Sequence, residues 1–257
     1  MEKPVTLIIG LGQTVGEAIA KRFDEGGHNV LAVGPDQALL DDLGKTVGDQ
    51  VARHHGPIHT RLGLRNAMAA GLEAYGHINN IICTPALPPA DSLMGLEIDT
   101  FEDTVLESLS GAVKTLRVFV EEMISARGEL ENTADRFGQA GSFTFVLSLA
   151  AARPQPGWFS ESVVQNAVLG VVKSAAMELA EHAIRVNTIV ALRPRAEGRE
   201  PWLKDRTPVG RAALPEEIAE AAYYLAGSGS AIVTGEALYL DGGRQHLSGL
   251  MVRDGED

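Results

Sequence analysis

Short runs of apolar, mostly β-branched residues alternate with longer amphipathic segments along the 257 residues of this chain. Strands that are apolar on both faces must be covered on both faces, and the helices that connect the strands of a parallel sheet provide that cover. The alternation therefore predicts an α/β fold with a doubly wound parallel sheet. The predicted strands are Val5–Ile9, Val30–Val33, Ile58–Thr60, Ile78–Cys83, Phe143–Leu147, Ile184–Val190 and Ala237–Leu240. The predicted helices are Thr14–Asp24, one that begins at Asp36–Leu43, Ala67–Tyr75, Phe101–Ala126, Ser162–Glu181 and Glu216–Ala226.

The alternation continues without an internal repeat or a linker rich in proline and serine. We therefore expect a single domain over residues 1–247, followed by a short tail over residues 248–257. Two polar stretches interrupt the rhythm, Arg127–Gly141 and Ala191–Asp205. We expect the first to be a solvated loop, and the alternative is a loop that docks a partner. The second follows the carboxyl end of a predicted strand, so we expect it over the ligand crevice of the sheet.

Charge and composition narrow the class of partner. The chain has 22 Lys and Arg against 34 Asp and Glu, a net charge of −12. It therefore lacks the basic surface of a nucleic-acid binder and is repelled by an anionic membrane. No apolar run approaches the roughly 20 residues that span a bilayer. Cys83 is the single cysteine of the chain, so an internal disulfide is excluded. We expect a soluble cytoplasmic protein without a nucleic-acid or membrane partner, and the seven histidines show no metal-ligand spacing.

A glycine-rich turn, Gly10–Gly16 (GLGQTVG), joins the first predicted strand to the first predicted helix. Glycines at such a turn let a pyrophosphate approach the backbone, and the free N–H groups and dipole of a helix N-terminus favour an anion. A tight turn with close helix packing would also need one or two of these glycines. We assign five residues of this turn to a dinucleotide: Gly10, Gly12, Gln13, Val15 and Gly16.

From Val5 to Gly243 the chain resembles the short-chain dehydrogenase/reductase family. The resemblance is most specific in the C-terminal half, in the motifs Ala167–Gly170 (AVLG), Ile184–Asn187 (IRVN), Pro215–Ala219 (PEEIA) and Val233–Gly243 (VTGEALYLDGG). It implies a seven-stranded Rossmann sheet and hydride transfer between NAD(H) or NADP(H) and an alcohol or carbonyl.

The resemblance also implies self-association. In the family, the helix that corresponds to the predicted helix Ser162–Glu181 packs against its copy in a neighbouring subunit. Here that helix carries apolar or small residues at 163/164, 167/168, 171/172 and 175/176. This stripe is wider than the cover of a sheet requires. We therefore expect a homodimer or homotetramer.

The family's chemistry implies a serine that binds the reacting oxygen and a tyrosine that exchanges its proton. A lysine lowers the pKa of the phenol and holds the ribose, and an asparagine lies behind them. Ser148 matches the serine, whereas Glu161, Gln165 and Ser108 stand at the positions of the tyrosine, lysine and asparagine. Three of the four positions thus depart from the family pattern. The departure matters because a suitable proton donor must lie within hydrogen-bond reach of the substrate.

No shift of alignment restores the missing pair. The chain has no tyrosine between Tyr75 and Tyr223 and no lysine between Lys114 and Lys173. Glu161 is then either a surrogate acid in a buried site or a solvated carboxylate in the first turn of a helix, where the dipole favours it. We favour the solvated carboxylate.

The predicted cofactor site departs from the family as well. Thr14 replaces the central glycine of the turn, and Cys83–Ala86 (CTPA) stands where the family has Asn-Asn-Ala-Gly. Pro85 has no N–H to donate. Asp36, after the second predicted strand, either reaches a ribose or caps the next helix. Asp36, Thr84 and Ala86 complete the residues assigned to NAD or NADP, and we expect cofactor binding to be weak or lost.

Three functions follow from this pattern. The first is a protein that has lost ordinary carbonyl reduction and binds a nucleotide or small ligand in a regulatory or scaffold role. The second is an active NAD(P)-dependent oxidoreductase with a rebuilt acid/base site at Glu161 or Ser148. The third is a structural subunit that pairs with an intact relative. The absent tyrosine and lysine favour the first.

Overall fold

The computed structural model describes residues 2–10, 13–48, 50–85, 88–128, 141–192 and 201–249. Within them, seven parallel strands form one sheet in the order β3-β2-β1-β4-β5-β6-β7. The doubly wound α/β prediction is therefore confirmed. The strands are β1 (Val5–Ile9), β2 (Asn29–Gly34), β3 (Ala52–His55), β4 (Asn80–Cys83), β5 (Ser142–Ser148), β6 (Arg185–Ala191) and β7 (Ala237–Leu240).

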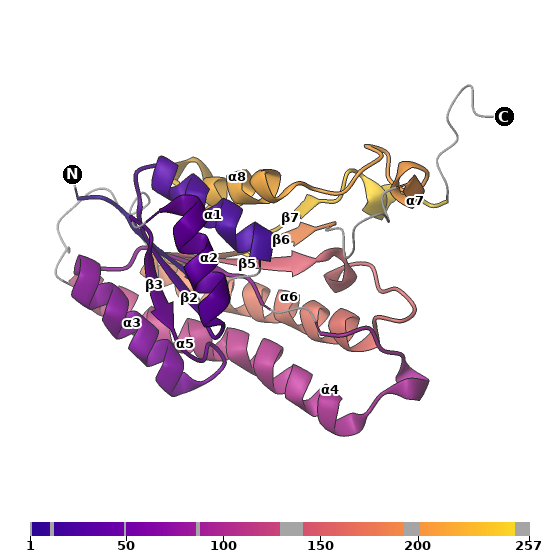
Figure 1. Cartoon of the computed structure of the whole chain (residues 1–257), viewed down its shortest axis with the longest axis horizontal. Helices are drawn as coiled ribbons and strands as arrows, with labels where there is room; N and C mark the ends of the chain where they lie inside the picture. Colours follow the sequence, from indigo (N-terminus) through magenta and orange to yellow (C-terminus); the bar gives the residue numbers. More distant parts are fainter. Residues whose placement is uncertain are drawn as a thin grey trace.

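Helices cover both faces of the sheet (Figure 1). On one face lie α1, α2 and α8, and on the other lie α3, α5 and α6. Alternate residues of β1 enter the two cores, Leu7 toward α3, α5 and α6 and Ile8 toward the opposite side, as the twofold repeat of a strand requires. The helices are α1 (Gln13–Glu25), α2 (Gln37–Val47), α3 (Arg61–Tyr75), α4 (Ile98–Thr104), α5 (Ser110–Gly128), α6 (Phe159–Leu179), α7 (Pro201–Lys204) and α8 (Pro215–Ala226).

The third strand differs from the prediction. It is β3 (Ala52–His55) and not Ile58–Thr60. This strand lies at the edge of the sheet and pairs with β2 alone, so half of its residues face solvent and the sequence has no continuous apolar run. Thr60 instead caps α3, where its Oγ1 accepts a hydrogen bond from the N–H of Gly63 at 3.1 Å.

The predicted long helix Phe101–Ala126 begins earlier and is not uniform. A π-helical turn, Val105–Leu109, separates α4 from α5. Such turns add a residue to the helix and often occur at functional sites. Ser108 lies in this turn, which packs against α6.

The helix α6 has one buried face. Val164, Val168, Val172 and Ala176 are buried at helical spacing, and the last three belong to the core that covers β5. By length and composition alone, Phe159–His182 is the one helix of the described residues that could cross a membrane. Because its inner face completes the core, we interpret it as a core helix of the domain.

The turn after β1 requires glycine at position 10. Gly10 has φ +86°, and a Cβ there would lie 2.4 Å from the carbonyl oxygen of Thr84. Gly27 has a similar φ of +82°, but a Cβ there would meet nothing within 4 Å. A comparison of alanine substitutions at these two positions therefore separates the cost of backbone strain from the cost of steric overlap.

Gly27→Ala should lower the free energy of unfolding by about 1–2 kcal/mol, the usual penalty for a left-handed residue with a Cβ. Gly10→Ala should lower it by more, because β1 and β4 must also move apart. Urea unfolding of both variants measures the difference. Equal losses would show that the close approach to Thr84 carries no energetic weight.

Candidate active site

The candidate site lies at the carboxyl ends of the central strands. The strand order reverses between β1 and β4, which is where open α/β sheets bind their ligands. Ser148 is the last residue of β5, the neighbour of β4. The chain then passes through a short connection and enters α6 at Phe159.

Ser148 forms hydrogen bonds with two residues of α6. Its backbone N–H donates to Oε1 of Gln165 at 2.7 Å, and its Oγ donates to Oε1 of Glu161 in a short hydrogen bond. The N–H of Ala150 donates to the Oγ of Ser148 at 3.2 Å. Glu161 and Gln165 are four residues apart, so both face β5 from adjacent turns of the helix. Exposure is 0% for Glu161, 3% for Gln165 and 7% for Ser148.

The prediction that Glu161 is a solvated carboxylate is therefore wrong. Helix α6 begins at Phe159, two residues before Glu161, and its first turn packs against the end of β5. Burial of a carboxyl group is expensive unless it is hydrogen-bonded, and the hydroxyl of Ser148 supplies such a bond. The arrangement places a carboxyl group in hydrogen-bond contact with a hydroxyl at the carboxyl end of β5.

A cavity of about 340 Å³ lies at the carboxyl ends of β1 and β4, and its lining does not include Ser148, Glu161 or Gln165. Ile9, Cys83 and Phe145 line it from β1, β4 and β5, and Ser108 lines it from the π-helical turn. Its other walls include four prolines, Pro35, Pro85, Pro88 and Pro89. Burial raises the pKa of the Cys83 thiol, so this cysteine is a packing residue and not a nucleophile.

The residues predicted to hold a cofactor are only partly brought together. Gly10 forms the turn after β1, and Val15 and Gly16 are buried in α1. Thr84 is buried at the end of β4. Asp36 caps α2, where its Oδ1 accepts from the N–H of Ala38 at 2.9 Å. Gly12, Ala86 and the side chain of Gln13 lie outside the described residues.

One contact at this edge was not predicted. Asp91, in the segment after β4, accepts hydrogen bonds from both the N–H and the hydroxyl of Ser160. No local pattern indicates it, because the two residues are 69 positions apart. Among the described residues, no group of three or more His, Cys, Asp or Glu is arranged to hold a metal ion.

Comparison with known proteins identifies the family. A family model described as enoyl-(acyl carrier protein) reductase matches residues 10–245. The chain belongs to the short-chain dehydrogenase/reductase family. It is 26% identical over 250 residues to glucose 1-dehydrogenase of Gluconobacter oxydans, covering 92% of this chain and 90% of the relative. It is 25% identical over 251 residues to a 3-oxoacyl-[acyl-carrier-protein] reductase of Chlamydia trachomatis, covering 92% and 95%.

A solved structure of the family is similar throughout. The 3-ketoacyl-(acyl-carrier-protein) reductase of Brucella melitensis, described as complexed with NADH, superposes with a TM-score of 0.85 at 27% identity. The match covers 95% of this chain and 98% of that one.

These findings overturn the first predicted function. Relatives that align with 92% of the chain are named as dehydrogenases and reductases, so the prediction of a regulatory or scaffold protein that has lost carbonyl reduction is wrong. In the structure, positions 148, 161 and 165 form one buried, hydrogen-bonded cluster. The alternative of an active oxidoreductase is the better supported.

The link between Ser148 and Gln165 should contribute to stability. Gln165→Met keeps the side-chain length but leaves the buried N–H of Ser148 without its acceptor, which should lower the free energy of unfolding by about 1–3 kcal/mol. Lys173→Met, at an exposed position of the same helix, is the matched control and should change it little. Urea unfolding distinguishes the two, and equal midpoints would contradict the assigned role.

Proposed function

We propose that the protein is an NAD(P)-dependent oxidoreductase that interconverts an alcohol and a carbonyl compound, with Ser148 and Glu161 as its proton-exchanging pair. The observation that carries the proposal is the buried hydrogen bond from Ser148 Oγ to Glu161 Oε1 at the carboxyl end of β5. Family relatives named as dehydrogenases and reductases support the reaction class.

The residues present fit a dinucleotide. Gly10 keeps the turn before α1 free of a side chain, and the helix that follows offers its N-terminus to a pyrophosphate. The cavity at the ends of β1, β4 and β5 provides apolar walls for a planar ring. When bound, a nicotinamide cofactor accepts or supplies the hydride. Pro85 offers no N–H at the end of β4, so we expect weaker binding than with a glycine or alanine there.

Ser148 is the member of the pair that a substrate reaches. Glu161 is fully buried, whereas Ser148 keeps 7% of its surface exposed. In alcohol oxidation, the substrate hydroxyl gives its proton to Ser148 Oγ while Ser148 gives its own to Glu161 Oε1. The carbon–hydrogen bond of the substrate breaks as its hydride leaves. Carbonyl reduction reverses each transfer, and the proton returns from Glu161 through Ser148 to the new hydroxyl.

The departures from the family's tyrosine and lysine are mutually consistent under this proposal. A phenol ordinarily ionises near pH 10, and a nearby cation lets it exchange protons at neutral pH, whereas the pKa of a carboxyl group is ordinarily near 4.3 and has to rise before the group can donate a proton at that pH. A lysine beside a carboxylate would hold it ionised. Gln165 is neutral, and its Oε1 fixes the backbone of Ser148 instead.

Turnover of the wild-type protein tests the proposal. NADH or NADPH should be oxidised in the presence of at least one member of a panel containing an aldonolactone, a β-ketoacyl thioester and a simple cyclic ketone. Glu161→Gln and Ser148→Ala should each lower kcat by about 100-fold or more, because each interrupts proton transfer.

Two controls accompany this test. NADH should still raise the melting temperature of Glu161→Gln, since a ligand that binds only the native state stabilises it. Glu178→Gln, which replaces an exposed carboxylate on the same helix, should keep full activity. Absence of turnover with both cofactors, or equal activity of Glu161→Gln and Glu178→Gln, would refute the proposal.

We also propose that two copies of the chain associate through the outer face of α4, α5 and α6. Contiguous exposed apolar surface on a soluble protein usually marks an interface. A second copy is the occupant that the family resemblance implies, and the face extends along several helices beyond the reach of a small ligand. The exposed apolar residues of this face are Ile98, Leu106, Val113, Val163 and Met177, with exposures of 62%, 59%, 48%, 41% and 81%.

Charge on this face should separate the copies. Val163→Asp and Met177→Asp should shift the mass measured by light scattering after size exclusion to that of one chain. Leu62→Asp, at a 71% exposed position on α3, is the matched control and should leave the mass unchanged. A wild-type mass of one chain would contradict the proposal.

A further inference from the structure

The segment after β4 is attached to the start of α6 by backbone and side-chain hydrogen bonds. The N–H of Asp91 donates to the carbonyl of Gly157 at 3.0 Å, and the carbonyl of Asp91 accepts from the N–H of Phe159 at 3.3 Å. Oδ1 of Asp91 accepts from the N–H of Ser160 at 3.0 Å, and Oδ2 accepts from the hydroxyl of Ser160 in a short hydrogen bond. We call this set of contacts the Asp91 latch.

The latch supplies a helix cap that the adjoining sequence lacks. The first N–H groups of a helix need acceptors from outside it. Trp158 stands at the N-cap position of α6, and an indole has no acceptor to offer. Asp91 satisfies the N–H groups of Phe159 and Ser160 instead, and its negative charge lies at the end of the helix that favours an anion.

Glu161 immediately follows Ser160, the residue that the carboxylate of Asp91 binds. The second turn of α6 has its own attachments, because Gln165 accepts from Ser148 N at 2.7 Å and Asn166 Nδ2 donates to the carbonyl of Ala151 at 2.8 Å. The first turn is attached to the segment after β4 by the latch. Glu161 therefore lies between two fixed points, one supplied by Asp91 and one by Gln165 and Asn166.

We propose that Asp91 is a positioning residue for Glu161: it caps α6 from the segment after β4 and thereby holds the carboxyl group against Ser148. The inference rests on the proposed function, in which that carboxyl group exchanges the proton. Both oxygens of Asp91 are occupied by Ser160, so Asp91 acts through the helix and not on the substrate.

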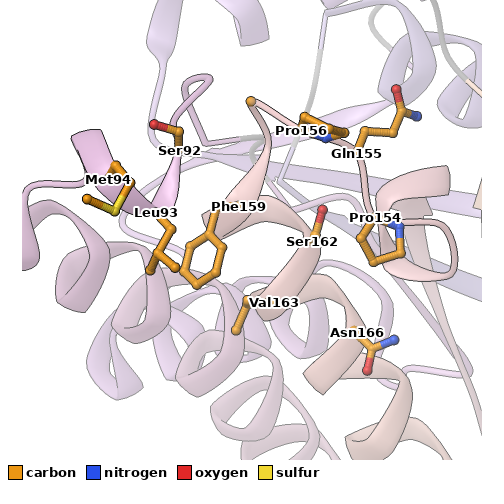
Figure 2. Close-up of a pocket in the computed structure, with 11 residues that line it drawn as sticks. Ser92, Leu93, Met94, Pro154, Gln155, Pro156, Phe159, Ser162, Val163 and Asn166 are labelled. Atoms are coloured by element: carbon orange, nitrogen blue, oxygen red, sulfur yellow. The ribbon is translucent and has the colours of Figure 1, made fainter.

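The surroundings of the latch support this role. Leu93 and Met94, two and three residues after Asp91, line an open pocket together with Phe159 and Pro154 (Figure 2). Leu93 and Met94 are 64% and 95% exposed, so the hydrogen bonds of the Asp91 latch, and not close packing, attach this segment to the start of α6. A displacement of the segment would carry the first turn with it. Misplacement of a catalytic group by about 1 Å is enough to lower a rate by two orders of magnitude.

Steady-state kinetics test the role. Asp91→Ala should lower kcat by about 10- to 100-fold and leave KM within about twofold, because it misplaces a proton-exchanging group without touching the substrate. Asp91→Asn keeps an acceptor for the Ser160 N–H and should recover most of kcat. Asp99→Ala and Asp99→Asn, at an exposed position in the first turn of α4, are matched controls and should behave as wild type.

Hydrogen exchange provides a readout that does not depend on turnover. In Asp91→Ala, the amides of residues 159–162 should exchange faster, while those of residues 172–176 should be unchanged. Unaltered exchange at 159–162, or a kcat for Asp91→Ala equal to that of Asp99→Ala, would overturn the role. Equal losses in the Ala and Asn variants would overturn it too, because charge would then matter and not geometry. If the wild-type protein shows no turnover, the proposed function fails, and exchange alone decides whether Asp91 fixes the turn.

Discussion

The end of β5 and the first two turns of α6 are joined by hydrogen bonds between buried residues. Ser148 donates from its backbone to Gln165 and from its hydroxyl to Glu161. Buried polar groups of this kind are costly when unpaired and rigid when paired. The bonds therefore hold one sheet edge and one helix in a single relative position.

The arrangement of strands and helices was largely predictable because burial leaves a strong pattern in the sequence. The central strand Val5–Ile9 is covered on both faces, so it is predicted with the bounds that the structure has. The edge strand Ala237–Leu240 is only half-buried, but it is a continuous apolar run and is predicted as closely. The edge strand β3 was missed because it alternates between exposed and half-buried residues. The π-helical turn at Val105–Leu109 was missed because a single extra residue in a helix barely changes apolar periodicity.

The candidate site was less predictable than the fold. Family resemblance picked out Ser148, Glu161 and Gln165, but local pattern misjudged the environment of Glu161. An acidic residue in a first turn is usually solvated, and only the long-range packing of α6 beneath β5 makes this one buried. Asp91 left no trace in local sequence, because its partner Ser160 lies in a distant segment.

One helix, α6, combines three surfaces that constrain each other. Its inner face is apolar and completes the core over β5 through residues such as Val168 and Val172. Its first two turns present Glu161 and Gln165 to Ser148, and its outer face exposes Val163 and Met177. At about 100° per residue, each position serves one surface only. A rotation of the helix that improved packing on the core or on the outer face would withdraw the carboxyl group from Ser148. The polar attachments at its start, from Asp91, Gln165 and Asn166, oppose that rotation. The chemistry proposed for this protein therefore depends on the position and rotation of α6 more than on any single side chain.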